Sequence, residues 1–215
     1  ISRISVSING SLGSIFLGMR YSPESVEMGL YSGATKLSSA GEQMIPPLGD
    51  ALYPSMVNKK DYRLFYRIVL RGGILWFLAC GLVEVLATPL CVLILGGQYA
   101  SAGGFLRILM VGVFFGYFSF MFGYPALSPI GKATWANAAI MVSAIVNLTA
   151  CAVLWLTGNI TPLTVCVVFS STNITTFIVR FGAFMKFRNL AEQDADLVVP
   201  NESSGSTWPR VSASY

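Results

Sequence analysis

The chain has 215 residues, of which 54% are hydrophobic and only 11% are charged, and its formal net charge is +4. An average soluble domain is about a quarter charged, so this composition, with a mean hydropathy of +0.64, predicts a membrane protein. The absence of histidine excludes imidazole metal sites, Ser-His-Asp triads and Cys-His dyads within these residues.

Six segments contain apolar runs that qualify as membrane-spanning helices, the first two more weakly than the others. In chain order they cover residues 4–19, 31–57, 68–95, 105–127, 135–157 and 162–186. The first is short and rich in Ser and Gly, and the chain starts without Met or a signal peptide, so we expect further chain upstream. Short turn-forming breaks force antiparallel neighbours, which predicts an all-α bundle of about six transmembrane helices.

Positive charges gather at alternate ends of these segments. They follow the second segment at Lys59, Lys60, Arg63, Arg67 and Arg71, the fourth at Lys132, and the sixth at Lys186 and Arg188. By the positive-inside rule these three edges are cytoplasmic, which agrees with six spans and both ends inside. We therefore expect a transmembrane bundle over 1–188 and, because 189–215 is polar, acidic at first and then Ser-rich, a disordered cytoplasmic tail there.

The second segment is unusual because it carries charges and the pair Pro46-Pro47. Five of its residues project onto one face of a helix at 100° per residue: Ser32, Lys36, Gln43, Pro47 and Asp50. A charge that faces lipid at mid-bilayer costs about 2.5–3.5 kcal/mol, so this face is expected to line a water-filled cavity or to contact partners. In the alternative interpretation, Lys36 and Asp50 extend to opposite interfaces and Glu42 pairs with another helix.

Other polar residues in the spans have several interpretations. Glu84, deep in the third segment, is either an ion-coupling site or a hydrogen-bonding partner between helices. Arg107 and Arg180 lie near span ends, where extension of the side chain to the interface accounts for them. Asn173 starts the glycosylation pattern NIT but lies inside a span, so the pattern is discounted.

The spans also contain small residues, cysteines and glycines, that suit helix packing. Four cysteines lie in or beside apolar runs without a CxxC pair and are predicted to be small core residues: Cys80, Cys91, Cys151 and Cys166. Gly112, Gly116 and Gly123 have nearly the spacing of small residues at close helix contacts.

Two kinds of ligand are not expected from the sequence. GKAT at 131–134 lacks the upstream glycine of a phosphate loop, so we expect no nucleotide site. Basic patches with interleaved aromatic residues are missing, so we expect no nucleic-acid binding.

Several sequence elements occur in a characteristic order: EMGLYSGATKL leading into ALYPSM, a basic loop, LGGQYASAGGFLRIL, and YPALSPIGK. Over residues 2–188 this order resembles the second half of polysaccharide flippases of the Wzx type, within the multidrug/oligosaccharidyl-lipid/polysaccharide exporter superfamily. The resemblance implies that the chain is one lobe of a two-lobed, MATE-like transporter in the bacterial cytoplasmic (inner) membrane. The missing N-terminal half of the same chain would form the other lobe.

The resemblance also implies the activity. Such transporters move undecaprenyl-diphosphate-linked oligosaccharide repeat units to the outer leaflet by alternating access, as non-enzymes without a metal or cofactor. Their partners would be the lipid-linked substrate, membrane lipids, and the polysaccharide polymerase and ligase machinery. The family offers no catalytic signature to transfer, so site roles rest on the polar helix face alone.

On that face, Lys36 is the expected diphosphate contact, because a lysine ammonium binds phosphate as a point charge. Ser39 and Gln43 are expected to hydrogen-bond sugar hydroxyls. Three acids are candidates for proton or sodium coupling: Glu42, Asp50 and Glu84.

Other functions fit the same pattern of spans. A cation-coupled multidrug or metabolite antiporter of the same superfamily would favour buried acids over Lys36, and a lipid II flippase is a close relative. A membrane-embedded glycosyltransferase or polymerase is disfavoured by short outer loops without a carboxylate pair. A non-catalytic assembly subunit would tolerate the loss of Lys36.

Overall fold

The computed structural model describes residues 12–22, 24–59 and 62–198, and every regular element within these ranges is a helix. Four helices are long and apolar enough to cross a membrane: Tyr62–Val85, Ala102–Leu127, Ala133–Leu156 and Pro162–Arg188. The described chain is therefore an all-α membrane protein. These four helices correspond to the third to sixth predicted segments. The second predicted segment is divided into two helices, and residues 4–11 of the first lie outside the described ranges.

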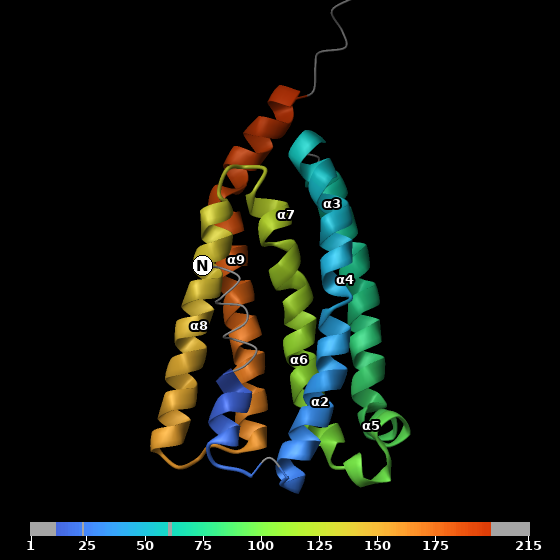
Figure 1. The fold of residues 1–215 in the computed structure, drawn as a ribbon. Coiled ribbons are helices and arrows are strands. Elements are labelled where there is room, and N and C mark those ends of the chain that lie inside the picture. The colour runs from blue at the N-terminus through green and yellow to red at the C-terminus, as the bar shows by residue number, and fades with distance from the viewer. Residues whose placement is uncertain (1–11, 23, 60–61, 199–215) are drawn as a thin grey trace, which may run out of the picture.

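The labelled helices follow one another along the chain. They are α2 (Val26–Glu42), α3 (Ile45–Lys59), α4 (Tyr62–Val85), α5 (Ala87–Leu95), the 3-10 turn η1 (Gly97–Tyr99), α6 (Ala102–Met121), α7 (Tyr124–Leu127), α8 (Ala133–Leu156) and α9 (Pro162–Val198). The long helices form an elongated bundle in which α6 is central and packs against α2, α4 and α9 (Figure 1). Residues 12–18 are also helical.

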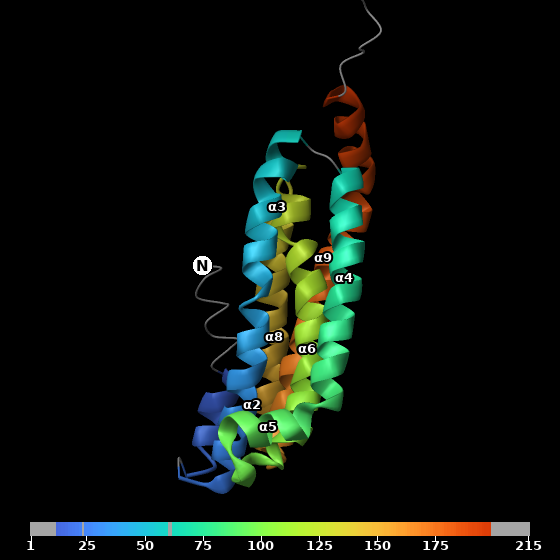
Figure 2. The same cartoon turned by 90° about the vertical axis from the view of Figure 1, so that its right-hand side faces the viewer.

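The segment predicted as one span over 31–57 is two helices. α2 ends at Glu42 and α3 begins at Ile45, immediately before Pro46-Pro47. A proline ring clashes with the preceding turn and offers no N–H, which ends a helix ahead of it, whereas in the first turn of a helix that N–H has no intrahelical partner. α2 and α3 still follow one another along the length of the bundle (Figures 1 and 2).

The span predicted over 68–95 is also divided. α4 ends at Val85, and α5 is a separate short helix at one end of the bundle (Figure 2). Pro89 has no N–H to donate to the carbonyl of Val85, four residues earlier, so one continuous ladder of helical hydrogen bonds is impossible there.

The three basic edges predicted from the sequence share one end of the bundle. The end of α3, the connection between α7 and α8 and the C-terminal part of α9 all lie at the upper end in Figure 1. The connections between α5 and α6 and between α8 and α9 lie at the opposite end. This arrangement is the one that the alternation of charge along the sequence requires.

The boundary of the expected tail differs from the structure. α9 continues past Arg188 to Val198, so the prediction of disorder from residue 189 is wrong as far as Val198. The sequence NLAEQDADL in this stretch contains Leu, Ala, Glu and Gln, which favour a helix that has already started. The remainder of the predicted tail, 199–215, lies outside the described residues.

The interior of the bundle contains two clusters of buried apolar residues. One is aromatic and lies toward the basic end, where Phe65, Phe122 and Phe184 contact one another. The other joins α2, α5, α6 and the start of α9, and it contains three of the cysteines. All four cysteines are buried and free, as the sequence predicted for small core residues.

Candidate functional site

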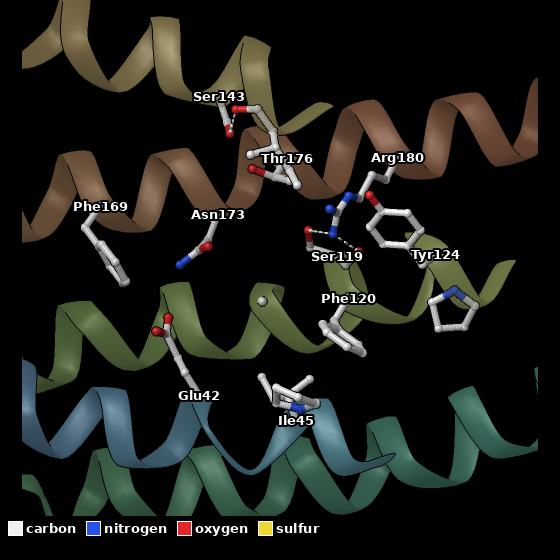
Figure 3. A pocket seen from close by; sticks show the side chains of 14 residues that line it. Glu42, Ile45, Ser119, Phe120, Tyr124, Ser143, Phe169, Asn173, Thr176 and Arg180 are labelled. Carbon is white, nitrogen blue, oxygen red and sulfur yellow. Dashed lines mark hydrogen bonds between the residues drawn. The ribbon is translucent and has the colours of Figure 1, made fainter. Parts of the chain in front are cut away.

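A cavity of about 500 Å³ lies at the break between α2 and α3, against α6, α7, α8 and α9 (Figure 3). Much of its wall is apolar and includes Ile45, Phe120 and Phe169. The polar groups in the wall are Glu42, Ser119, Tyr124, Ser143, Asn173, Thr176 and Arg180. The break that the two prolines impose on the second segment thus opens onto the part of the interior where polar side chains gather.

Arg180 is the cation of this cavity, and its side chain is only 8% exposed. Its Nη1 donates to the backbone oxygen of Ser119 at 2.7 Å and to the Oγ of the same residue at 3.3 Å. Its Nη2 donates to the backbone oxygen of Ala136 at 3.4 Å, and its Nε has no acceptor among the described residues. The prediction that Arg180 extends to the membrane interface is therefore wrong.

The C-terminal end of α6 accommodates the guanidinium of Arg180. The carbonyl of Ser119 is among the last four of α6, which have no intrahelical partner, and a positive charge there also interacts favourably with the helix dipole. Gly123 makes the approach possible, because a Cβ at this position would lie 2.9 Å from the Nη1 of Arg180. Glycine is therefore required at 123 by a close contact with a side chain.

Glu42 and Asn173 form the other polar part of the cavity. Glu42 is the last residue of α2, and Figure 3 shows its carboxylate and the amide of Asn173 pointing toward one another. The Nδ2 of Asn173 is buried, and the carboxylate of Glu42 is the acceptor that it faces. Asn173 and Arg180 are two turns apart on α9, or about 10 Å, so the acidic and basic ends of the cavity are separated.

The structure places most of the sequence-predicted site residues outside this cavity. Lys36, Gln43 and Asp50 are exposed on the outside of α2 and α3, and Ser39 is half-buried without lining the cavity. Glu84 is exposed in the last turn of α4, where its backbone oxygen accepts a hydrogen bond from the Nε of Arg107 at 3.3 Å. Of the six predicted residues, only Glu42 lines the cavity.

Exposed polar residues nevertheless recur along α2, α3 and the break between them. Four exposed residues, Lys36, Gln43, Pro47 and Asp50, form what we call the polar stripe; Lys36 lies in α2, Gln43 directly after it, and Pro47 and Asp50 in α3. Apolar residues such as Ile74 and Leu78, which are 55% and 60% exposed, form the outer surface of the neighbouring α4. The exposed surface of α2 and α3 therefore mixes charged and polar groups with apolar ones such as Met44 and Leu48, whereas Ile74 and Leu78 lie on an apolar part of α4.

Three polar residues of α9 were not singled out from the sequence as site residues. Asn173, Thr176 and Arg180 lie at i, i+3 and i+7, which places them on one face of a helix, and the face-by-face analysis applied to the second segment would have found them. By itself, Asn173 stands out in the sequence only as the start of a glycosylation pattern, and Arg180 only as a cation near the end of a span. Ser119 carries no such signal, because it lies alone within an aromatic stretch of α6.

Within the described residues, no group of three or more acidic or cysteine side chains is placed to hold a metal ion. The polar groups of the cavity instead suit hydrogen bonding and charge pairing with a ligand. No protein-family model, curated protein or solved structure matches the chain.

Proposed function

We propose that the protein translocates undecaprenyl-diphosphate-linked oligosaccharide repeat units across the bacterial cytoplasmic membrane for surface polysaccharide synthesis. The observation that carries the proposal is the exposed polar stripe on α2 and α3, in a bundle whose other long helices have the length and composition of membrane spans. The sequence resemblance to Wzx-type flippases supplies the substrate class.

The polar stripe argues for an aqueous path beside the bundle. In a bundle surrounded by lipid, Lys36 and Asp50 would face hydrocarbon, at a cost of about 2.5–3.5 kcal/mol each on insertion scales. Water or a second bundle on this side removes that cost. A transporter with two lobes around a central path provides both, and interrupted helices, such as α2 and α3 form here, commonly border such paths.

The chemistry of the stripe suits a lipid-linked sugar. The diphosphate needs a cation, for which Lys36 is the candidate, and the sugar hydroxyls need hydrogen-bonding groups such as those of Gln43 on the stripe and of the half-buried Ser39 one turn before it. The polyprenyl tail remains in lipid while the head group passes along the stripe. The basic end of the bundle faces the cytoplasm in this proposal, by the positive-inside rule.

A second candidate function is supported by Glu42. Its carboxylate lines the internal cavity and forms no salt bridge with a described residue, which is an arrangement that a cation-coupled antiporter could use. In that case Glu42, and not Lys36, would be the essential residue for transport.

The test compares Lys36→Ala, Lys36→Arg and Glu42→Gln in cells whose own repeat-unit flippase is deleted. If the proposal is correct, Lys36→Ala lowers surface polysaccharide at least about tenfold at an unchanged protein level, and Lys36→Arg retains most of it, because a charge-assisted contact is worth about 1.5–3 kcal/mol. Arg63→Ala, which removes an exposed cation outside the polar stripe, is the matched control and leaves synthesis unchanged.

Two results would redirect the proposal. Full polysaccharide synthesis by Lys36→Ala would remove Lys36 from the substrate path and count against the flippase. Loss of organic-cation export in Glu42→Gln, together with normal polysaccharide in Lys36→Ala, would identify the antiporter.

A further inference from the structure

We propose that the cavity at the α2–α3 break is a binding site for the carboxylate or phosphate group of a ligand, with Arg180 as its cationic anchor. The site is separate from the polar stripe, whose exposed residues do not line the cavity. The inference therefore does not depend on lipid-linked sugar transport.

The first argument is the uncompensated charge of Arg180. The side chain is 8% exposed, and no described residue forms a salt bridge with it. Its contacts are all with neutral acceptors, two on Ser119 and one on Ala136, which solvate the guanidinium without neutralising it. Because neutral acceptors offset only part of the cost of burying a charge, an anion in the cavity would complete this environment.

The second argument is an excess of hydrogen-bond donors in one place. The Nε of Arg180 is buried in the cavity wall and lacks an acceptor, whereas the Nδ2 of Asn173, on the same wall, faces the carboxylate of Glu42. Ser119 accepts a hydrogen bond from Arg180 through its Oγ, so its own hydroxyl hydrogen remains available to a ligand. Carboxylate and phosphate groups offer acceptors only, which is the complement of this set.

The third argument is size. A cavity of about 500 Å³ is within the usual range for small-molecule sites, about 300–1,000 Å³, and it far exceeds the space that one water occupies. The apolar wall around Ile45, Phe120 and Phe169 suits the body of an organic anion or of a lipid headgroup region. Glu42 stands near Asn173, so the part of the ligand at that end carries a hydroxyl or amine and no second acid.

The competing interpretation is that Arg180 only caps the C-terminal end of α6. That role uses Nη1 and Nη2, and it does not explain the buried Nε of Arg180, which has no acceptor among the described residues. It predicts no ligand response at all.

The experiment measures thermal unfolding of the intact protein in nanodiscs. In one arm, inorganic phosphate or acetate is added to phosphatidylcholine nanodiscs, with sodium chloride keeping the ionic strength constant. In the other arm, phosphatidate replaces part of the phosphatidylcholine and no soluble anion is added. The two arms distinguish a soluble anion from a lipid headgroup.

Two variants test the site independently. Arg180→Gln removes the anchor, and the half-saturating anion concentration should rise about 10- to 100-fold, since a hydrogen bond to a charged group is lost. Gly116→Leu adds an apolar side chain to the cavity wall and leaves Arg180 itself unchanged; a Cβ at 116 has room, because it would meet only the Cδ1 of Ile45, at 3.9 Å. This second variant keeps the test decisive if Arg180→Gln does not fold, and Arg63→Gln serves as the control for exposed cations.

The site is supported if phosphate or acetate, or phosphatidate, raises the unfolding temperature of the wild type and of Arg63→Gln but not of Gly116→Leu. The inference is overturned if neither arm has an effect on the wild type. It is also overturned if all variants respond equally, since that result indicates general salt stabilisation of the folded state.

Discussion

The polar stripe and the internal cavity lie close together in the chain, and Gln43 of the stripe directly follows Glu42 of the cavity. Their side chains differ in exposure: Lys36, Gln43 and Asp50 are exposed, whereas Arg180 and Ser119 are buried and hydrogen-bonded to one another. Exposed polar groups in a membrane bundle require something outside it, such as water or another lobe. Buried ones are satisfied within the bundle or by a ligand that enters it.

This difference predicts that the two regions respond differently to mutation. Changes in the cavity should alter the stability of the fold, because their groups connect α6, α8 and α9. Changes in the stripe should alter transport and access to water while the fold remains intact.

The largest effect on stability is expected for Arg180→Ala. The substitution removes the hydrogen bonds to Ser119 and Ala136 and leaves a void where the buried side chain was, so the free energy of unfolding should fall by about 2–4 kcal/mol. Reversible unfolding in bicelles measures the loss. Arg63→Ala, at an exposed position, should change it by less than about 0.5 kcal/mol, and an equally small change for Arg180→Ala would contradict the structural role.

A smaller loss of stability is expected for Gly123→Ala. The added Cβ would lie 2.9 Å from the Nη1 of Arg180 and 3.0 Å from the backbone oxygen of Phe120, so the guanidinium must shift, at a cost of about 1–3 kcal/mol. Gly104→Ala is the matched control, since a Cβ there meets nothing within 4 Å and alanine favours the helix. Equal unfolding free energies for the two variants would show that Gly123 is not required for the approach of Arg180.

The smallest effect on stability, but a clear one on accessibility, is expected for cysteine substitutions on the polar stripe. Gln43→Cys and Asp50→Cys should react with a membrane-impermeant maleimide, whereas Ile74→Cys and Leu78→Cys on the apolar face of α4 should react at least about tenfold more slowly, because lipid covers them. The four native cysteines are buried, so background labelling is low.

Equal protection of all four positions would show that the polar stripe is covered as completely as α4. In that case a protein partner, and not an aqueous path, lies against it. Labelling of all four positions would instead remove the distinction between a polar and an apolar face.

Much of the fold could be predicted from the sequence. The apolar runs predicted the helices α4, α6, α8 and α9, and the alternation of positive charge predicted which connections share an end of the bundle. Proline removes a helical hydrogen bond at Pro46-Pro47 and at Pro89, where helices end, but also at Pro54, where α3 continues, so proline alone does not place the breaks. The candidate site was predicted less well: Glu42 lines the cavity, but Lys36, Ser39, Gln43, Asp50 and Glu84 do not.

The sequence by itself determined that the chain is helical and apolar enough for a membrane, where proline removes a helical hydrogen bond, and that one face of the second segment is polar. These properties are local: they depend on the length of apolar runs, on proline and on the period of the helix. Only the tertiary structure decided that Arg180 is buried against the end of α6, with Asn173 and Thr176 on the same cavity. The orientation of a helix face toward a neighbour depends on packing between segments far apart in the chain, and the close approach at Gly123 is one such contact.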